Sequence, residues 1–216
     1  MTAALLLASE PISDAEVVRR VLDGDTAVFE ILMRRYNQRV YRAVRAVLRD
    51  DAEVEDVMQQ AYLNAYSHLG QFAERAQFST WLIRIAVNEA LARVRKRGRL
   101  ELDGGEDVIA FAASDVPDPE QQALTAQMRA VVEAQVEALP MVYRTVLVLR
   151  DVEGLSTAEA ASCLGVSEDV VKTRLHRARA MVRDGLTRRA GVTVESIYEF
   201  GNSRCDRVVA AVMARL

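Results

Sequence analysis

The segment "LGVSEDVVKTRLHRARAMVRD" (residues 164–184) predicts a capped, amphipathic and strongly basic helix in a chain whose formal net charge is -3. Gly165 suits the left-handed conformation that ends a preceding helix, and Ser167 can cap the next one. Apolar residues then recur at helical spacing and predict one buried stripe: Val171, Leu175, Ala178 and Val182. The opposite face is polar and basic, with Asp169, Thr173, His176 and Arg177 flanked by Lys172 and Arg174.

The preceding segment, "GLSTAEAASCLG" (residues 154–165), predicts a second, shorter helix. Ser156 and Glu159 have the spacing of a capping box, and the alanines that follow are small enough for a close helix crossing. A short helix, a glycine-containing turn and a longer basic helix make a helix-turn-helix, whose second helix can present side chains to base edges in DNA. The alternative is an ordinary solvated, Arg-rich surface helix. We predict DNA binding, because the caps, the small residues and the basic outer face occur together.

The whole chain has the composition of a globular protein, with 216 residues and 50% hydrophobic residues, which indicates one or two domains. Cys163 and Cys205 have no partners at metal-ligand spacing and form no disulfide framework, so they favour a reducing compartment. The apolar stretch "AALLLA" (residues 3–8) is too short to span a membrane and lacks the basic flank of a signal peptide. We therefore expect a cytoplasmic protein that does not associate with a membrane.

Charge is unevenly distributed along the chain. Residues 84–99 carry six Lys and Arg against one acid, whereas residues 101–120 carry seven acids and no Lys or Arg. The acidic stretch also contains a Gly-Gly pair and two prolines, which are typical of a linker. Helical periodicity dominates elsewhere. The predicted fold is all-α, with two small helical domains joined by a flexible acidic linker, the second domain containing the helix-turn-helix.

The N-terminal half is expected to form four helices, over residues 14–24, 25–49, 52–72 and 78–99. Phe72, Phe78 and Trp81 gather around the short polar loop before the last of these helices, which is basic. Aromatic side chains beside basic ones suit unstacked bases and phosphates. Simple packing of the helical bundle explains them equally well, so both interpretations stay open.

The C-terminal segment, residues 191–216, predicts a helical extension with its own apolar stripe: Cys205, Val208, Val209, Val212, Met213 and Leu216. We expect this helix to pack on the preceding domain; the alternative is a regulatory surface for a partner. A redox role for Cys205 is disfavoured, because a cysteine on an apolar stripe is usually inert.

Three segments carry a resemblance to a known family: "AEVEDVMQQAYLNAY", "FSTWLIRIAVNEALARVRKR" and "LPMVYRTVLVLRDVEGLSTAEAASCLGVSEDVVKTRLHRAR". In this order they resemble the extracytoplasmic-function (group IV) sigma factors of bacterial RNA polymerase. The resemblance implies a factor that binds core polymerase, reads the -35 and -10 promoter elements and helps to melt the DNA. It implies an N-terminal sigma domain over residues 1–98, the acidic linker over 99–120, a C-terminal sigma domain over 121–190 and the extension over 191–216.

The same resemblance implies three sets of binding residues. The set for the clamp helices of the largest polymerase subunit is Asp56, Gln59, Gln60, Tyr62 and Asn64, although many relatives carry an acid where Gln60 stands. The set for the -10 element is Gln71, Phe72, Arg75, Ala76, Arg84 and Asn88. The set for the -35 element is Arg150, Ser156, Thr157, Ser167, Asp169, Lys172, Thr173, His176 and Arg177. The implied partners are core RNA polymerase, through its clamp helices and flap region, promoter DNA and an anti-sigma factor.

Two other function classes are alternatives to a sigma factor. A stand-alone helix-turn-helix regulator would bind an operator as a dimer, and the C-terminal helix could provide the dimer contact. An enzyme is less compatible with the sequence, which has no metal cluster, phosphate-binding glycine loop or nucleophile-base pair, and whose two histidines, His68 and His176, fall in different domains. We expect no catalytic residue, cofactor or bound metal.

Overall fold

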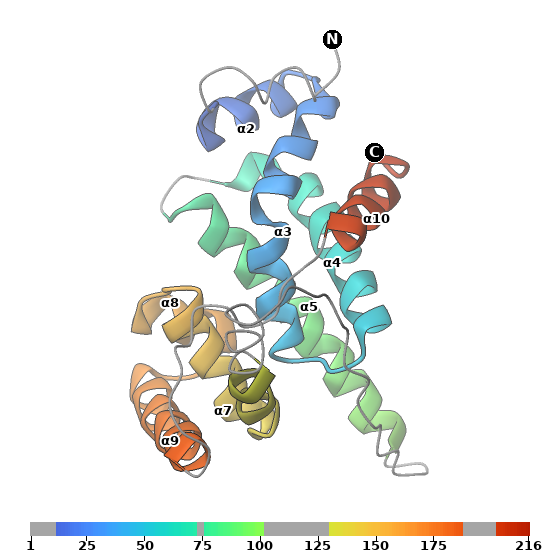
Figure 1. The fold of residues 1–216 in the computed structure, drawn as a ribbon. Coiled ribbons are helices and arrows are strands. Elements are labelled where there is room, and N and C mark those ends of the chain that lie inside the picture. Colours follow the sequence, from blue (N-terminus) through green and yellow to red (C-terminus); the bar gives the residue numbers. More distant parts are fainter. Residues whose placement is uncertain (1–11, 73–75, 102–129, 188–201) are drawn as a thin grey trace, which may run out of the picture.

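The computed structural model describes residues 12–72, 76–101, 130–187 and 202–216. Within these ranges every regular element is a helix, which confirms the predicted all-α class (Figure 1). The apolar residues 3–8 and almost all of the acidic linker lie outside the described residues.

Side-chain caps begin two of the helices described in the N-terminal domain. The Ser13 side chain accepts a hydrogen bond from the backbone N–H of Glu16 at 3.2 Å, and Asp50 caps a later helix by accepting from Glu53 at 2.9 Å. The predicted second helix is shorter than expected, because a 3-10 turn precedes it. The α-helices described in this domain are α2 (Asp14–Leu22), α3 (Phe29–Arg45), α4 (Asp51–Ser67) and α5 (Phe78–Glu101).

The core of this domain lies where α3, α4 and α5 meet. Phe29 is fully buried and meets the ring of Tyr62 edge-on, with ring centroids 6.4 Å apart. The Tyr62 hydroxyl donates to the backbone carbonyl of Met33 at 3.2 Å, so the polar end of this buried ring is satisfied. Each large side chain buried in this way stabilises the fold by about 1.5–3 kcal/mol.

The C-terminal domain contains the predicted helix-turn-helix. The Ser156 backbone N–H donates to Glu159 at 2.7 Å and the Ser156 side chain accepts from the Glu159 N–H at 3.2 Å, so both halves of the capping box form. Gly165 ends the first helix with φ 63°, and Ser167 accepts from the Val170 N–H at 3.4 Å. Residues 130–137 are helical and are followed by α7 (Met141–Leu147), a π-helical turn (Val148–Val152), α8 (Thr157–Leu164) and α9 (Glu168–Thr187).

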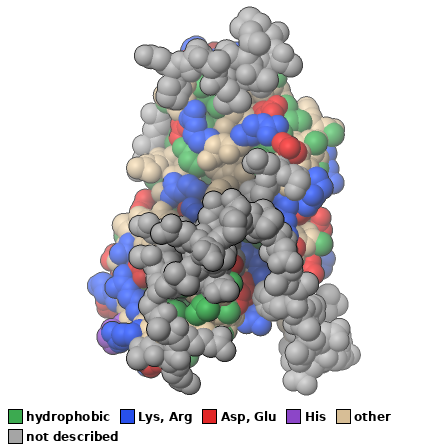
Figure 2. Space-filling view, in the orientation of Figure 1, with side chains coloured by type: hydrophobic (Ala, Val, Ile, Leu, Met, Phe, Trp, Pro, Cys, Tyr) green, Lys and Arg blue, Asp and Glu red, His purple; other side chains and the backbone are tan. Residues whose placement is uncertain are grey.

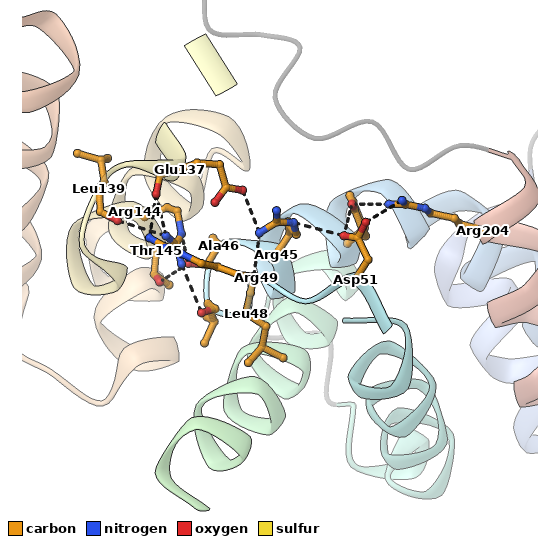
Figure 3. Close-up of polar contacts among 12 residues, drawn as sticks. Arg45, Ala46, Leu48, Arg49, Asp51, Glu137, Leu139, Arg144, Thr145 and Arg204 are labelled. Atoms are coloured by element: carbon orange, nitrogen blue, oxygen red, sulfur yellow. Dashed lines mark hydrogen bonds and ion pairs between the residues drawn. The ribbon is translucent and has the colours of Figure 1, made fainter. Parts of the chain in front are cut away.

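The two domains meet at the C-terminal end of α3 (Figure 3). Arg144 of α7 is 1% exposed and donates from Nε to the carbonyl of Ala46 at 2.8 Å and from Nη1 to that of Leu139 at 3.2 Å. The Thr145 hydroxyl also donates to the Ala46 carbonyl, at 3.1 Å. The carbonyl of Ala46, at the end of α3, thus finds its donors in the other domain.

A buried carboxylate provides the second interdomain contact. The side chain of Glu153 is fully buried. It accepts hydrogen bonds from Arg39 at 2.8 Å and from Arg42 at 2.6 Å, and these two arginines lie about one turn apart on α3. Two guanidinium groups therefore compensate one buried charge, as a buried carboxylate requires.

The C-terminal extension forms α10 (Asn202–Met213), which packs in cis as expected but on a different domain. It lies against α3 and α4 of the N-terminal domain, not on the domain that precedes it in sequence (Figure 1). The apolar stripe of α10 identifies a buried face, but it contains no information about which surface covers that face.

The contact at Glu153 generates a prediction about domain arrangement. Replacing Glu153 with Gln keeps the shape but removes the charge, and each charge-assisted bond to Arg39 and Arg42 contributes about 1.5–3 kcal/mol. We expect a larger radius of gyration in small-angle X-ray scattering and faster hydrogen exchange at the end of α3. The control is Asp151→Asn, because Asp151 pairs with Arg179 inside the C-terminal domain. Equal scattering curves for E153Q and the wild type would contradict this role.

Candidate nucleic-acid interface

The outer face of α9 is the most exposed part of the helix-turn-helix. The predicted stripe Val171, Leu175, Ala178 and Val182 is buried, as expected. Lys and Arg side chains gather over α9 at the lower left of Figure 2. The residues predicted to read DNA from this helix are all exposed: Ser167, Asp169, Lys172, Thr173, His176 and Arg177.

A groove runs between this face and α7. It is lined by Asp169, Thr173 and Arg177 of α9 together with Val142 and Tyr143 of α7. The Arg177 guanidinium lies 3.5 Å from the Tyr143 hydroxyl. Sequence reasoning missed the α7 side of the groove, to which the exposed side chain of Val142 contributes.

The other predicted -35 residues lie at helix starts. Ser156 is exposed and Thr157 is half-buried at the N-terminus of α8, where free backbone N–H groups favour anions. Arg150 is half-buried and its Nε has no hydrogen-bond partner within the described residues. Hydrogen bonds from Ser156, and to a smaller degree the charge of Arg150, lower the pKa of the Glu159 carboxyl.

Around the N-terminus of α5, the aromatic side chains form one cluster. Phe72 lies 5.4 Å from both Phe78 and Trp81, measured between ring centroids, and Phe78 lies 5.6 Å from Tyr36. Phe78 is 2% exposed and belongs to the core, whereas Phe72 and Trp81 are half-buried. Core packing therefore accounts for Phe78, whereas the rings of Phe72 and Trp81 keep part of their surface accessible.

The remaining predicted -10 residues surround this cluster. Arg84 and Asn88 lie one helical turn apart on α5 and are exposed, as are Gln71 and Ala76. Arg75 lies outside the described residues.

Helix α8 packs against the same helix, α5. Burial raises the pKa of the Cys163 thiol in α8 to about 12, and the positive charge of Arg84 on α5 opposes that shift. The domain that carries the helix-turn-helix therefore lies beside the predicted -10 residues of α5, a proximity that the sequence did not reveal.

The predicted polymerase-binding residues of α4 differ in exposure. Asp56 and Gln60 are exposed, and Gln59 and Asn64 are half-buried. Tyr62 is wholly buried, and burial raises the pKa of its hydroxyl well above the usual value. Its predicted direct contact with a partner does not fit this structure, because its ring and hydroxyl are used within the core.

Asp56 and Asn64 also form hydrogen bonds with residues of α5. Asp56 accepts from Arg93 at 3.2 Å, and Asn64 donates to Glu89 at 2.7 Å.

Among the described residues, no group of three or more His, Cys, Asp or Glu side chains could hold a metal ion. No described helix has the length and apolar character needed to cross a membrane.

Comparisons with known proteins agree with this geometry. Residues 32–100 match the family model Sigma-70 region 2, and residues 129–182 match Sigma-70, region 4. The RNA polymerase sigma-H factor of Pseudomonas aeruginosa is 34% identical over 80% of this chain and 93% of its own length. The chain belongs to the extracytoplasmic-function sigma factors. A sigma-E factor of this family from Escherichia coli K12 is 33% identical over 81% of this chain and 94% of its own length.

Two solved structures have the same fold. The sigma factor RpoE of Bartonella quintana, in complex with the anti-sigma factor NepR, has a TM-score of 0.57 at 20% identity and covers 74% of this chain and 95% of its own. CnrH, in complex with the cytosolic domain of CnrY, has a TM-score of 0.53 at 27% identity and covers 81% of this chain and 97% of its own.

The family membership defines the activity. As a sigma factor, the protein binds core RNA polymerase and directs promoter-specific initiation of transcription. None of these matches describes an enzyme. Region 2 spans α3 to α5, and region 4 spans the helix-turn-helix, whereas α10 lies beyond both family models.

The two cysteines should differ in reactivity. At pH 8 the Cys163 thiol stays protonated, because its pKa is about 12, and it is 1% exposed. A thiolate is the reactive species, so iodoacetamide should modify Cys205 alone. Peptide mass mapping checks this, with the urea-unfolded chain as the control in which both cysteines react. Equal modification of Cys163 in the folded protein would contradict the burial of α8.

Proposed function

We propose that this sigma factor reads the -35 element with the outer face of α9. The observation that carries the proposal is that this face is both basic and exposed, on a helix fixed by two caps and a buried stripe. Arg177 and Lys172 have the chemistry for guanine edges, while Asp169, Thr173 and His176 complete the surface. Ser156, Thr157, Ser167 and Arg150 are assigned to DNA phosphates, contacts that would fix the register of the helix.

Replacing Arg177 with Ala should reduce use of the -35 element. A bidentate contact to a base contributes about 1–3 kcal/mol, so promoter affinity should fall by roughly five- to 150-fold. Arg179→Ala is the matched control, because Arg179 lies on the same helix but pairs with Asp151. Binding is measured with holoenzyme on promoters that carry intact and scrambled -35 elements. Equal affinity of R177A and wild type would remove Arg177 from the reading surface.

The -10 element is assigned to the aromatic cluster and the adjacent face of α5. An extruded base would stack on the half-buried rings of Phe72 and Trp81, and Gln71, Arg75 and Ala76 are assigned to the capture of the same base. Arg84 and Asn88 are assigned to the nearby DNA backbone. Extrusion costs on the order of a few kcal/mol, which these contacts must offset.

Replacing Phe72 with Ala should reduce open-complex formation. Stacking of one base on an aromatic side chain contributes about 1–3 kcal/mol, and this contribution is lost with the ring. The yield of heparin-resistant complexes measures the effect. An abasic promoter provides the control: where the extruded base is missing, F72A and wild type should perform equally. A defect of the same size on both templates would show that Phe72 only stabilises the fold.

The polymerase contact is assigned to α4, with Asp56, Gln59, Gln60 and Asn64 facing the clamp helices of the largest subunit. Tyr62 supports this helix from inside the core. The C-terminal domain is assigned to the flap region of polymerase, and the acidic residues 99–120 to the path toward the active site. Like charge keeps this linker off the DNA phosphates. No catalytic step is assigned to the chain.

An anti-sigma factor is the proposed regulator, acting in the cytoplasm. Both similar solved structures are complexes, one with the anti-sigma factor NepR and one with the cytosolic domain of CnrY, which supports this partner class. Run-off transcription with core polymerase tests the whole proposal. Promoter-specific transcripts should appear only when this protein is added. Tight operator binding without polymerase would instead favour a stand-alone regulator.

A further inference from the structure

Arg45, at the end of α3, lies between two carboxylates that belong to different domains (Figure 3). Its Nη1 is 2.9 Å from the carboxylate of Glu137 in the C-terminal domain, and its Nε is 3.5 Å from that of Asp51 at the start of α4. The side chains of Arg45 and Glu137 are only 7% and 10% exposed, whereas Asp51 is exposed. The interdomain ion pair is thus the shorter and the more buried of the two.

The carboxylate of Glu137 depends on this arginine. Both of its oxygens are buried, and within the described residues neither of them has a hydrogen-bond partner. The ion pair with Arg45 therefore compensates the negative charge of Glu137. A buried carboxylate that loses its cation is costly, so a shift of Arg45 away from Glu137 weakens the contact between the two domains.

Arg204 of α10 is a second cation on Asp51. It donates from Nη2 to the Asp51 carboxylate at 2.8 Å and from Nη1 to the Tyr41 hydroxyl at 2.7 Å. Its guanidinium also lies over the Tyr41 ring, 5.7 Å from the ring centroid. The fully buried side chains of Val208 and Val212 hold the rest of α10 in place. Arg204 is therefore fixed beside Asp51 by several contacts within the N-terminal part of the structure.

The ion pair between Arg204 and Asp51 influences the position of Arg45. With Arg204 in place, the charge of Asp51 is compensated at 2.8 Å, and Arg45 lies closer to Glu137 than to Asp51. When Arg204 is lost, Asp51 attracts Arg45 more strongly, because no second cation offsets its charge at short range. Movement of Arg45 toward Asp51 leaves Glu137 buried without its ion pair.

We propose that α10 is an intramolecular latch on the domain arrangement: by holding Asp51 through Arg204, it keeps Arg45 on Glu137 and keeps the two sigma domains docked. The matches to regions 2 and 4 end at residues 100 and 182, so the latch belongs to a segment outside both family models.

Docking of the domains affects function because the two promoter elements are far apart. As their names indicate, the -35 and -10 elements are separated by about 25 base pairs, or about 85 Å at 3.4 Å per base pair. In the docked arrangement α8 packs on α5, and α9 packs on α8. Helices are about 10–12 Å across, so α9 lies within roughly 25 Å of α5 at closest approach. If the two reading surfaces are those proposed above, the latch opposes simultaneous reading of both elements.

A variant that removes only the charge of Arg204 tests the latch in the free, full-length protein. Arg204→Gln keeps much of the side-chain length and leaves the valine stripe of α10 intact. Domain separation is measured by single-molecule energy transfer between dyes attached to unnatural amino acids at the exposed positions Arg95 and Met181. We expect R204Q to raise the fraction of open molecules by about threefold or more, the effect of one partly exposed ion pair.

Two further variants on α10 are the controls. Arg204→Lys keeps the positive charge and should remain as closed as the wild type. Arg207→Gln removes an ion pair of the same helix, but its partner is Glu55 at 2.5 Å and not Asp51. R207Q should therefore leave the open fraction unchanged. Equal opening of R204Q and R207Q would show that α10 acts only through the stability of its packing, and the proposal would be wrong.

Asp51→Asn provides the most specific test. In the R204Q protein, this second change removes the carboxylate that attracts Arg45 away from Glu137. The double variant R204Q/D51N should therefore return to the closed fraction of the wild type, although it has lost one more charged group. A double variant as open as R204Q, or an R204Q protein as closed as the wild type, would overturn the latch.

Run-off transcription separates the latch from the proposed function, because the energy-transfer measurement needs neither polymerase nor DNA. At limiting concentrations of the sigma factor, R204Q should give about threefold more promoter-specific transcript than R207Q, since a larger fraction is competent to bind. More opening without more transcript would contradict the role of the latch in promoter binding. A wild type that gives no promoter-specific transcript would reject the proposed function, and the energy-transfer result would still decide for or against the latch.

Discussion

The Arg144 guanidinium joins the two halves of this molecule. It is buried at the point where α3 ends, and it donates to carbonyls on both sides of the interface, among them Ala46 and Leu139. A helix leaves its last carbonyls unpaired and carries partial negative charge at that end. A buried cation there satisfies both requirements, provided that the C-terminal domain stays in contact. The contact between the two domains therefore supplies hydrogen-bond donors that α3 lacks at its C-terminal end.

This docking has different consequences for the two proposed DNA-reading surfaces. The outer face of α9 points away from the N-terminal domain and remains exposed. Helix α8, in contrast, packs on α5, whose exposed Arg84 and Asn88 belong to the proposed -10 surface. The domain arrangement thus restricts the -10 surface more than the -35 surface.

The sequence predicted the features that depend on residues close together in the chain, and not those that depend on distant residues. The helix-turn-helix was predicted residue by residue, because the Ser156–Glu159 box and the Gly165 turn depend on neighbours within a few positions. Tyr62 was assigned to the polymerase surface by the family resemblance, yet its hydroxyl donates to the Met33 carbonyl inside the core. The position of α10 depends on complementary charges more than 150 residues away. Helical periodicity contains no signal for such a pairing.

The polar nature of the contact around Glu153 determines how the two domains behave when they separate. Arg39, Arg42 and Glu153 are charged groups that water solvates well, so their exposure creates no apolar patch of the kind that causes association. An interface made of large aliphatic side chains would instead expose apolar surfaces on both domains, and such surfaces favour association. Separation of this particular contact therefore exposes charged groups and adds no apolar surface that favours association.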